Sequence, residues 1–315
     1  MQKLQFIKIS KKNRAWTMVL VLIGMIVLSA IISPNFRTPR NLLNILNQNS
    51  IYGIMALGMG CIMLTGSIDL SAGSIACLAG VLAAPIFGKY GMAAGFAVGI
   101  SLGFVIGLIN GLLITKGRIA YFVVTLGMMQ VARGIVYVIT NGVPVQGIPT
   151  EFKIVGMGKI AGFFPVSALI WLVLAVVMAL LLKYTRFGQY VYALGGNERA
   201  AWLSGVDKDL IKIMVYAIGG AFFALGGLVL TLRVLMATAD ACQSYEMTAI
   251  ASCVIGGIAM DGGQGNILSS IIGALIMGLV MNMLQLMGIS SYWQQIFTGA
   301  IIIAAVAVDS ISSKK

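Results

Sequence analysis

Residues 91–115 read GMAAGFAVGISLGFVIGLINGLLIT, twenty-five positions without a charged side chain. A transmembrane helix needs about 20 consecutive apolar residues, so this stretch is long enough to cross a bilayer. Within it, Gly95, Gly99, Gly103, Gly107 and Gly111 recur at every fourth position. Because positions i and i+4 share one face of a helix, the predicted helix carries a ridge without side chains. We interpret the ridge as a surface on which a second helix packs closely; a smooth face along a transport pathway is the alternative.

The rest of the chain has the same apolar character. Of its 315 residues, 59% are hydrophobic and 10% are charged, against roughly 25% charged residues in soluble domains. We therefore predict an all-α polytopic membrane protein, one transmembrane domain over residues 1–315, with about ten membrane helices. Their approximate bounds are 15–33, 42–65, 71–87, 91–115, 118–139, 166–182, 211–232, 247–260, 267–287 and 293–309. The short runs at 71–87 and 247–260 are alternatively re-entrant or broken helices.

The positive charges predict how the chain is oriented in the membrane. With ten crossings both chain ends lie on one side, which then holds 14 Lys and Arg residues against 6 on the other side, with Arg133 inside a span. The positive-inside rule places both termini in the cytoplasm. This topology predicts a cytoplasmic N-terminal arm at 1–14, an extracytoplasmic loop at about 141–165, ordered and rich in Pro and Gly, and a cytoplasmic loop at about 183–210.

The composition argues against catalysis or metal binding by this chain. There is no histidine, which removes the commonest general base and the commonest metal ligand. Cys61, Cys77, Cys242 and Cys253 are isolated, so no metal site or disulfide is expected. The motif GxxxxGK[ST] is absent, so any energy from ATP must enter from another chain, and no cofactor is expected in this one. The net charge of +12 is dispersed in ones and twos between apolar runs, a pattern of membrane topology rather than of nucleic-acid binding.

Two ionisable side chains lie in or beside predicted spans. Asp69 lies between two apolar runs in GSIDLSAG, residues 66–73. We expect it to cap the helix that starts near Ser71, with an essential buried charge as the alternative. Arg133 lies inside the run 118–139, where an unpaired cation is costly and needs a partner. Asp69 is the candidate partner if the fold brings the two together.

Side-chain amides are the other polar groups of the spans. An amide offers both donors and acceptors without a net charge, which suits a polyhydroxyl solute on a transport pathway. Amides equally form hydrogen bonds between membrane helices, so pathway and structural roles both stay open. The residues concerned are Asn47, Gln48, Asn49, Ser50, Asn110, Gln130, Asn282 and Gln285.

The cytoplasmic loop contains a predicted short helix of about seven residues within GGNERAAWLSGVDKDL, residues 195–210. Asn197 is a favourable N-cap and Gly205 a favourable stop signal. We expect an exposed docking element with a small apolar surface and a charged rim; a helix lying on lipid head groups through Trp202 is the alternative. The residues assigned to docking are Asn197, Glu198, Arg199, Ala200, Ala201, Leu203, Ser204 and Gly205.

Six stretches, taken in order, resemble one known family over nearly the whole chain. They are GSIDLSAG (66–73), GLINGLLIT (107–115), FVVTLGMMQVARG (122–134), TRFGQYVYALGGNERAAWLSGV (185–206), YEMTAIASCVIGG (245–257) and DGGQG (261–265). They resemble the permease subunits of bacterial ATP-binding-cassette sugar importers, the group that contains the ribose, xylose, arabinose and galactose permeases.

The resemblance implies an ABC-importer permease fold in the bacterial cytoplasmic (inner) membrane. It implies a second permease copy or a related permease, ABC ATPase subunits that hold ATP and Mg, and an extracytoplasmic sugar-binding protein. It also implies that the helix at 197–205 is the coupling helix and that a monosaccharide, ribose first, is transported. A gradient-coupled secondary transporter is the alternative. Such a transporter would need paired charges in its spans, and only Asp69 and Arg133 come close to this description; it would have no need for a docking helix.

Overall fold

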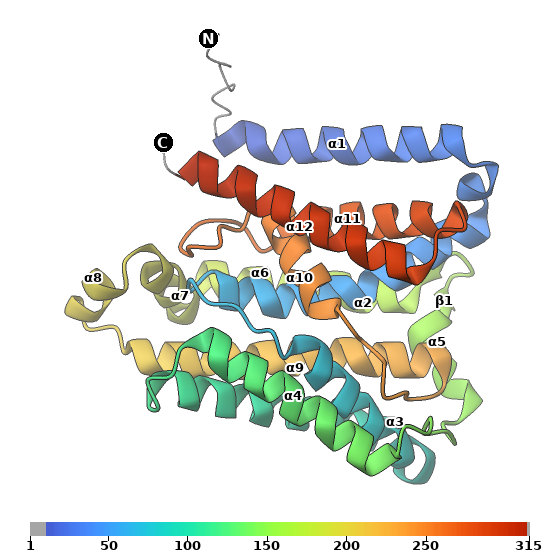
Figure 1. The fold of residues 1–315 in the computed structure, drawn as a ribbon, viewed down its shortest axis with the longest axis horizontal. Coiled ribbons are helices and arrows are strands. Elements are labelled where there is room, and N and C mark those ends of the chain that lie inside the picture. Colours follow the sequence, from blue (N-terminus) through green and yellow to red (C-terminus); the bar gives the residue numbers. More distant parts are fainter. Residues whose placement is uncertain (1–10, 314–315) are drawn as a thin grey trace.

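The computed structural model describes the backbone of residues 11–313 and, apart from residues 11–15, 291, 305 and 308–313, their side chains. Most of the predicted N-terminal arm therefore lies outside the described residues. The chain forms a bundle of long helices that run side by side (Figure 1). The helices are α1 (Lys11–Ile32), α2 (Pro39–Met63), α3 (Ala72–Thr115), α4 (Tyr121–Thr140), α5 (Lys153–Met157), α6 (Val166–Tyr184), α7 (Arg186–Gly196), α8 (Glu198–Leu203), α9 (Lys208–Val234), α10 (Tyr245–Ile255), α11 (Ser269–Leu286) and α12 (Ser291–Ser313).

The bundle has two distinct ends. The start of α1 and the end of α12 lie at the same end as α7 and α8, which we call the α8 end (Figure 1). The short helix α5 and the strand β1 lie at the opposite end, which we call the α5 end. Among the described residues, five helices are long and apolar enough to cross a membrane, namely α3, α4, α6, α9 and α11. The apolar part of α1, Trp16–Ile32, and α10 are shorter apolar helices.

The apolar runs 71–87 and 91–115 together form the single long helix α3. It is broken at Gly91, whose backbone angles of φ 86° and ψ 179° are open to glycine but not to residues with a side chain. Its two halves fold against each other there, since a Cβ at Gly95 would overlap the ring of Phe87. The expected separation of two helical segments is therefore confirmed, with the break at Gly91.

The glycine ridge of α3 packs directly on α9. A Cβ at Gly103 would overlap the backbone oxygen of Gly220, and one at Gly107 would overlap that of Tyr216. At Gly111 the added atom would lie 2.7 Å from the Cα atom of Ile213. Close packing was the preferred interpretation of this ridge, and these contacts confirm it.

Two helices begin between the ends of the bundle rather than at one of them. The irregular segment 64–71 runs inward from the α8 end to the start of α3, and 235–244 runs inward from the α5 end to the start of α10 (Figure 1). The two starts meet, since a Cβ at Gly73 would overlap the backbone oxygen of Cys242. With 11 residues, α10 is about 16 Å long, roughly half of a 30 Å hydrocarbon core. The run at 247–260 is thus a broken helix.

The segment 141–165 is ordered, as predicted. It contains the 3₁₀ helix η2 (Thr150–Phe152), α5, and the strands β1 (Lys159–Ile160) and β2 (Phe164–Pro165), which pair in an antiparallel hairpin. An isolated bridge joins Val145 to Ala237 and so ties the loop to the segment that precedes α10. Gly156 of α5 lies directly against the backbone of Arg233 in α9.

Candidate functional site

The short helix α8 has the predicted caps. The side-chain oxygen of Asn197 accepts a hydrogen bond of 2.9 Å from the backbone N–H of Ala200. At the other end Gly205 takes φ 86°, a left-handed conformation that ends the helix. The Ser204 hydroxyl donates to the Ala200 carbonyl at 2.9 Å. The helix has six residues, one fewer than predicted.

Two ion pairs clamp α8 to α9. The carboxylate of Glu198 binds the ammonium groups of Lys212 at 2.7 Å and Lys208 at 3.0 Å. The hydrogen bond from Lys212, and then that from Lys208, hold the pKa of the Glu198 carboxyl below its usual value, although its partial burial acts in the opposite direction. Glu198 is therefore engaged within the chain, but its side chain is still 43% exposed, so its place at the rim of a docking surface stays a prediction.

The exposed apolar surface of α8 differs from the predicted one. Ala201 is only 5% exposed and belongs to the main hydrophobic core, so the expectation that it fills a groove on a partner is wrong. Leu203 is 71% exposed and Trp202 is 58% exposed, while Arg199 and Ala200 also face outward. Burial of Ala201 instead fixes the orientation of α8, which presents Leu203 and Trp202 to the outside.

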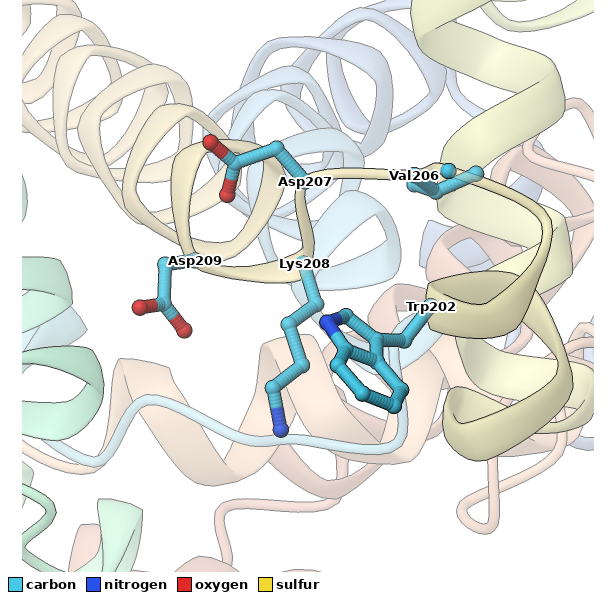
Figure 2. Close-up of a pocket in the computed structure, with 6 residues that line it drawn as sticks. Trp202, Val206, Asp207, Lys208 and Asp209 are labelled. Atoms are coloured by element: carbon cyan, nitrogen blue, oxygen red, sulfur yellow. The ribbon is translucent and has the colours of Figure 1, made fainter.

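A shallow hollow lies where α8 meets the start of α9. Figure 2 shows the indole of Trp202 beside the side chain of Lys208, with the carboxylates of Asp207 and Asp209 on the other side of the backbone turn. Asp207 caps α9 by accepting the N–H of Leu210 at 3.0 Å. Asp209 pairs with Lys116 at the end of α3, at 2.8 Å. The polar groups here thus hold three helices together at the α8 end.

Directly before α8, three chain segments meet through their backbones, a contact that we call the glycine junction. It is formed by the end of α7 at 195–196, the residues 64–66 after α2, and the turn 261–265. The N–H of Gly263 donates to the carbonyl of Leu64 at 2.9 Å. A Cβ at Gly195 would overlap both Leu64 and Gly263, and one at Gly262 would lie 3.0 Å from the Cα atom of Gly195. The junction therefore has no room for side chains.

Asp69 is fully buried and hydrogen-bonded at the start of α3. One carboxylate oxygen accepts from the backbone N–H of Ser71 at 2.8 Å and from its hydroxyl at 2.5 Å. The other accepts from the side-chain amide of Asn110 at 3.3 Å. Ser71, rather than Asp69, is the N-cap residue of α3, so Asp69 does not cap the helix; its carboxylate fixes the turn that leads into it, which is a structural role.

Arg133 does not pair with Asp69. Its guanidinium donates to the backbone carbonyls of Ala239 at 2.6 Å and Ala241 at 2.9 Å, both in the segment before α10. The suggested Asp69–Arg133 pair is therefore wrong. Irregular backbone has unsatisfied carbonyls, and Arg133 satisfies two of them in the segment where Leu235, Cys242 and Ser244 all have positive φ angles.

Three of the predicted amides make contacts between helices. The Asn47 side chain accepts from the Ser167 hydroxyl of α6 at 2.8 Å. Asn282 of α11 exchanges two hydrogen bonds with Asn41 of α2, at 2.9 and 3.1 Å. Asn49 is fully buried against Gly278 of α11, and among the described residues neither of its amide atoms has a hydrogen-bond partner. Asn47 and Asn282 therefore have the structural role, whereas the role of Asn49 stays open.

The remaining amides divide between the surface and a second cluster. Gln130 of α4 and Gln285 of α11 are exposed, and the Ser50 hydroxyl donates to the Asn47 carbonyl at 2.7 Å. Gln48 instead donates to the hydroxyl of Tyr52, one turn further along α2, at 3.2 Å. The ring of Tyr52 packs edge-on against that of Tyr245, with centroids 4.8 Å apart.

Most residues of this cluster were not among those predicted from the sequence. Asn44 accepts a 2.7 Å hydrogen bond from the guanidinium of Arg233, at the end of α9. Together with Gln48 and Tyr52, it forms an i, i+4, i+8 series on one face of α2, and that spacing was visible in the sequence. Tyr245 and Arg233 carried no such signal, because their proximity depends on how α9 and α10 pack on α2.

Comparison with known proteins supports a transport role. Residues 41–306 match the family described as "Branched-chain amino acid transport system / permease component". The chain is 41% identical to the ribose import permease protein RbsC of Escherichia coli strain K12, over 95% of each chain. It is 42% identical to RbsC of Bacillus subtilis, over 90% of this chain and 89% of the relative.

The galactose/methyl galactoside import permease protein MglC of Escherichia coli strain K12 is 36% identical, over 99% of this chain and 97% of the relative. No solved structure matches the chain. The family match covers most of the bundle, from the start of α2 into α12. The chain therefore belongs to the family of permease components of the branched-chain amino acid transport system type.

Proposed function

We propose that this chain is the membrane-spanning permease subunit of an ATP-binding-cassette importer that carries a monosaccharide, ribose or a related sugar, into a bacterial cell. Relatives that align over nearly the whole chain are named as ribose and galactose import permease proteins. The geometric observation that carries the proposal is α8, a capped helix with exposed Trp202 and Leu203, clamped to α9 at one end of an apolar bundle.

The proposed topology has ten crossings with both termini in the cytoplasm. The two halves of α3 count as two crossings, and α10 with the irregular segment before it counts as one. The α8 end then faces the cytoplasm, which agrees with the excess of Lys and Arg in the segments assigned to it. The loop 141–165 at the α5 end faces outward, where a sugar-binding protein would dock. The protein thus resides in the bacterial cytoplasmic membrane.

In this proposal α8 is the coupling helix. ATP and Mg bind to separate ABC ATPase subunits, and Leu203 and Trp202 insert into a groove on the ATPase, with Arg199 at its edge. Apolar side chains at the centre of such contacts contribute most of the binding energy. A second copy of the permease, or a related permease, completes the pathway.

The secondary-transporter alternative has less support. Coupling to an ion gradient normally uses paired or relayed charges within the membrane. Asp69 is occupied by Ser71 and Asn110, and Arg133 is occupied by backbone carbonyls. Among the described residues neither forms an ion pair within 4 Å, although the buried carboxylate of Glu246 is near enough to interact electrostatically with both.

The experiment is co-purification of the ATPase subunits with wild-type permease and with Leu203→Glu. Because Leu203 is 71% exposed, the variant should fold and reach the membrane, yet lose ATPase association and ATP-dependent sugar uptake. Tyr184→Glu is the control, because Tyr184 is 68% exposed at the end of α6, on the same side of the bundle. Retained association and uptake in Leu203→Glu would show that α8 is not the coupling element.

A further inference from the structure

Two groups of polar side chains inside the bundle include residues of α2. Asn47, Asn41 and Asn282 bond across contacts between helices, as described above. The second group consists of Asn44, Gln48, Tyr52, Arg233 and Tyr245, which we call the polar ladder. Its members on α2 are distinguished by their partners, which lie on α9 and α10 rather than on α6 and α11.

The ladder runs from the α5 end toward the middle of the bundle. Asn44 lies about one turn inside the start of α2, and Tyr52 lies eight residues further on, a rise of about 12 Å. Tyr245 is the first residue of α10, which begins between the two ends of the bundle (Figure 1). The ladder therefore ends beside the place where the starts of α3 and α10 meet.

The ladder is not a sealed core contact. Asn44, Gln48, Arg233 and Tyr245 are each partly exposed, whereas nearly all of α2 beyond them is buried. An arginine and two amides that open toward hydrocarbon would be costly, so such groups face a water-filled space or another protein chain. Discontinuous helices that start near the midplane are typical of transporter binding sites.

The chemistry of the ladder suits a sugar. Asn and Gln amides both donate and accept, the guanidinium donates in a fixed fork, and each can bind adjacent hydroxyl groups. The rings of Tyr52 and Tyr245 offer apolar faces to the C–H surface of a pyranose or furanose, with hydroxyls at their edges. Apart from Arg233, to which Asn44 is hydrogen-bonded, the ladder residues are uncharged. A mostly uncharged set of amides and hydroxyls suits a neutral polyhydroxyl solute.

Resting on the proposed function, we propose that the polar ladder lines the outer half of the sugar pathway and makes the first contacts with the monosaccharide after its release at the α5 end. The sugar hydroxyls replace hydrogen bonds that the ladder residues now make with one another. Because each hydrogen bond to the sugar replaces one within the ladder, the net binding energy is small and the sugar can move on.

The test compares Gln48→Leu with Gln130→Leu in the complete complex of permease, ATPase subunits and sugar-binding protein, reconstituted in vesicles. Gln48→Leu should lower the rate of ribose uptake about tenfold, the effect of losing one hydrogen bond to a polar group, while ATP hydrolysis stimulated by the binding protein is retained. Gln130→Leu, an identical change at an exposed site on α4, should transport normally. Uptake by Gln48→Leu at the wild-type rate would overturn the proposal.

A second measurement does not depend on transport. In a background in which the four native cysteines are replaced, Gln48→Cys should react with a charged, membrane-impermeant thiol reagent added from outside. Val173→Cys, at an exposed apolar position on α6, should not react. An unreactive Gln48→Cys would overturn the ladder as a water-filled path. Absence of ATP-dependent ribose uptake by the wild-type complex would instead reject the proposed function, and the labelling result would still report on the ladder.

Discussion

The contact between α3 and α9 gives the sharpest quantitative prediction, the substitution Gly103→Ala. The added methyl carbon would lie 2.5 Å from the Cβ atom of Ala224, and it would also overlap the backbone oxygen of Gly220. Ordinary Cβ contacts begin at 3.4 Å, so the two helices would have to separate locally by at least about 0.9 Å, since the Gly220 oxygen lies closer still. Because one obstacle is backbone, no change of rotamer relieves the clash. Overpacking of this kind costs about 1–3 kcal/mol.

Gly134→Ala on α4 is the matched control. A Cβ there has nothing within 4 Å, and alanine is favoured over glycine in a helix by about 1 kcal/mol. Both glycines are inside helices, so this gain applies to both variants and cancels; the two should differ in stability by about 1–3 kcal/mol, with Gly103→Ala the less stable.

Thermal unfolding of detergent-purified permease, followed with a thiol-reactive fluorophore, measures this difference. The dye reports unfolding because Cys61, Cys77, Cys242 and Cys253 are all buried. An unfolding midpoint for Gly103→Ala equal to or above that of Gly134→Ala would refute the packing argument. Normal assembly of Gly103→Leu together with blocked uptake would assign the ridge to the pathway instead.

Three further predictions concern topology, the helix start and the ion pairs. A single cysteine at Thr150, in a background without native cysteines, should react with an impermeant reagent in intact cells; reaction only after lysis would reverse the orientation. Asp69→Asn should retain more folded, active permease than Asp69→Leu, because the asparagine side chain still accepts hydrogen bonds from Ser71. Leucine would leave buried donors unsatisfied, at a cost of about 1–3 kcal/mol each. Equal and complete loss of uptake in both variants, at normal protein yield, would indicate an essential charge. Glu198→Gln should lower the free energy of unfolding by up to about 1 kcal/mol per ion pair at pH 7. Since the folded-state pKa of Glu198 is depressed, this difference should be complete above the usual glutamate pKa and be lost as the pH falls through the lower folded-state pKa. Unfolding midpoints measured from neutral to strongly acidic pH would follow this loss, and a difference that does not change with pH would contradict the ion-pair explanation.

Much of the helical plan could be predicted because it depends on local properties of the chain. From apolar runs bounded by charges or by glycine, the ends of α4, α6 and α11 were predicted to within a few residues of their observed ends. The caps of α8 were also predictable, because Asn197 and Gly205 act on the backbone next to them. The glycine ridge indicated close packing, although only the fold shows that α9 is the partner.

What could not be predicted depends on which face of an element meets the rest of the chain. A helix of six residues has no periodicity from which to tell that Ala201 is buried and Leu203 exposed. Similarly, Asp69 could be named only as a candidate partner of Arg133, because the sequence does not reveal that an irregular segment brings the carbonyls of Ala239 and Ala241 to it. The amides of α2 could be identified from the sequence, but they could not be divided between structural and pathway roles, since neighbouring positions on that helix face different partners.

The glycine junction limits how the bundle can move. Contacts between side chains can adjust by rotamer changes, but Leu64, Gly195 and Gly263 meet through backbone atoms that have no such freedom. A displacement at the end of α7 would therefore directly displace the segment that leads into α3 and the segment that follows α10. These are the two helices that begin inside the bundle, so a push on α8 that displaced the end of α7 would reach both of them through backbone contacts.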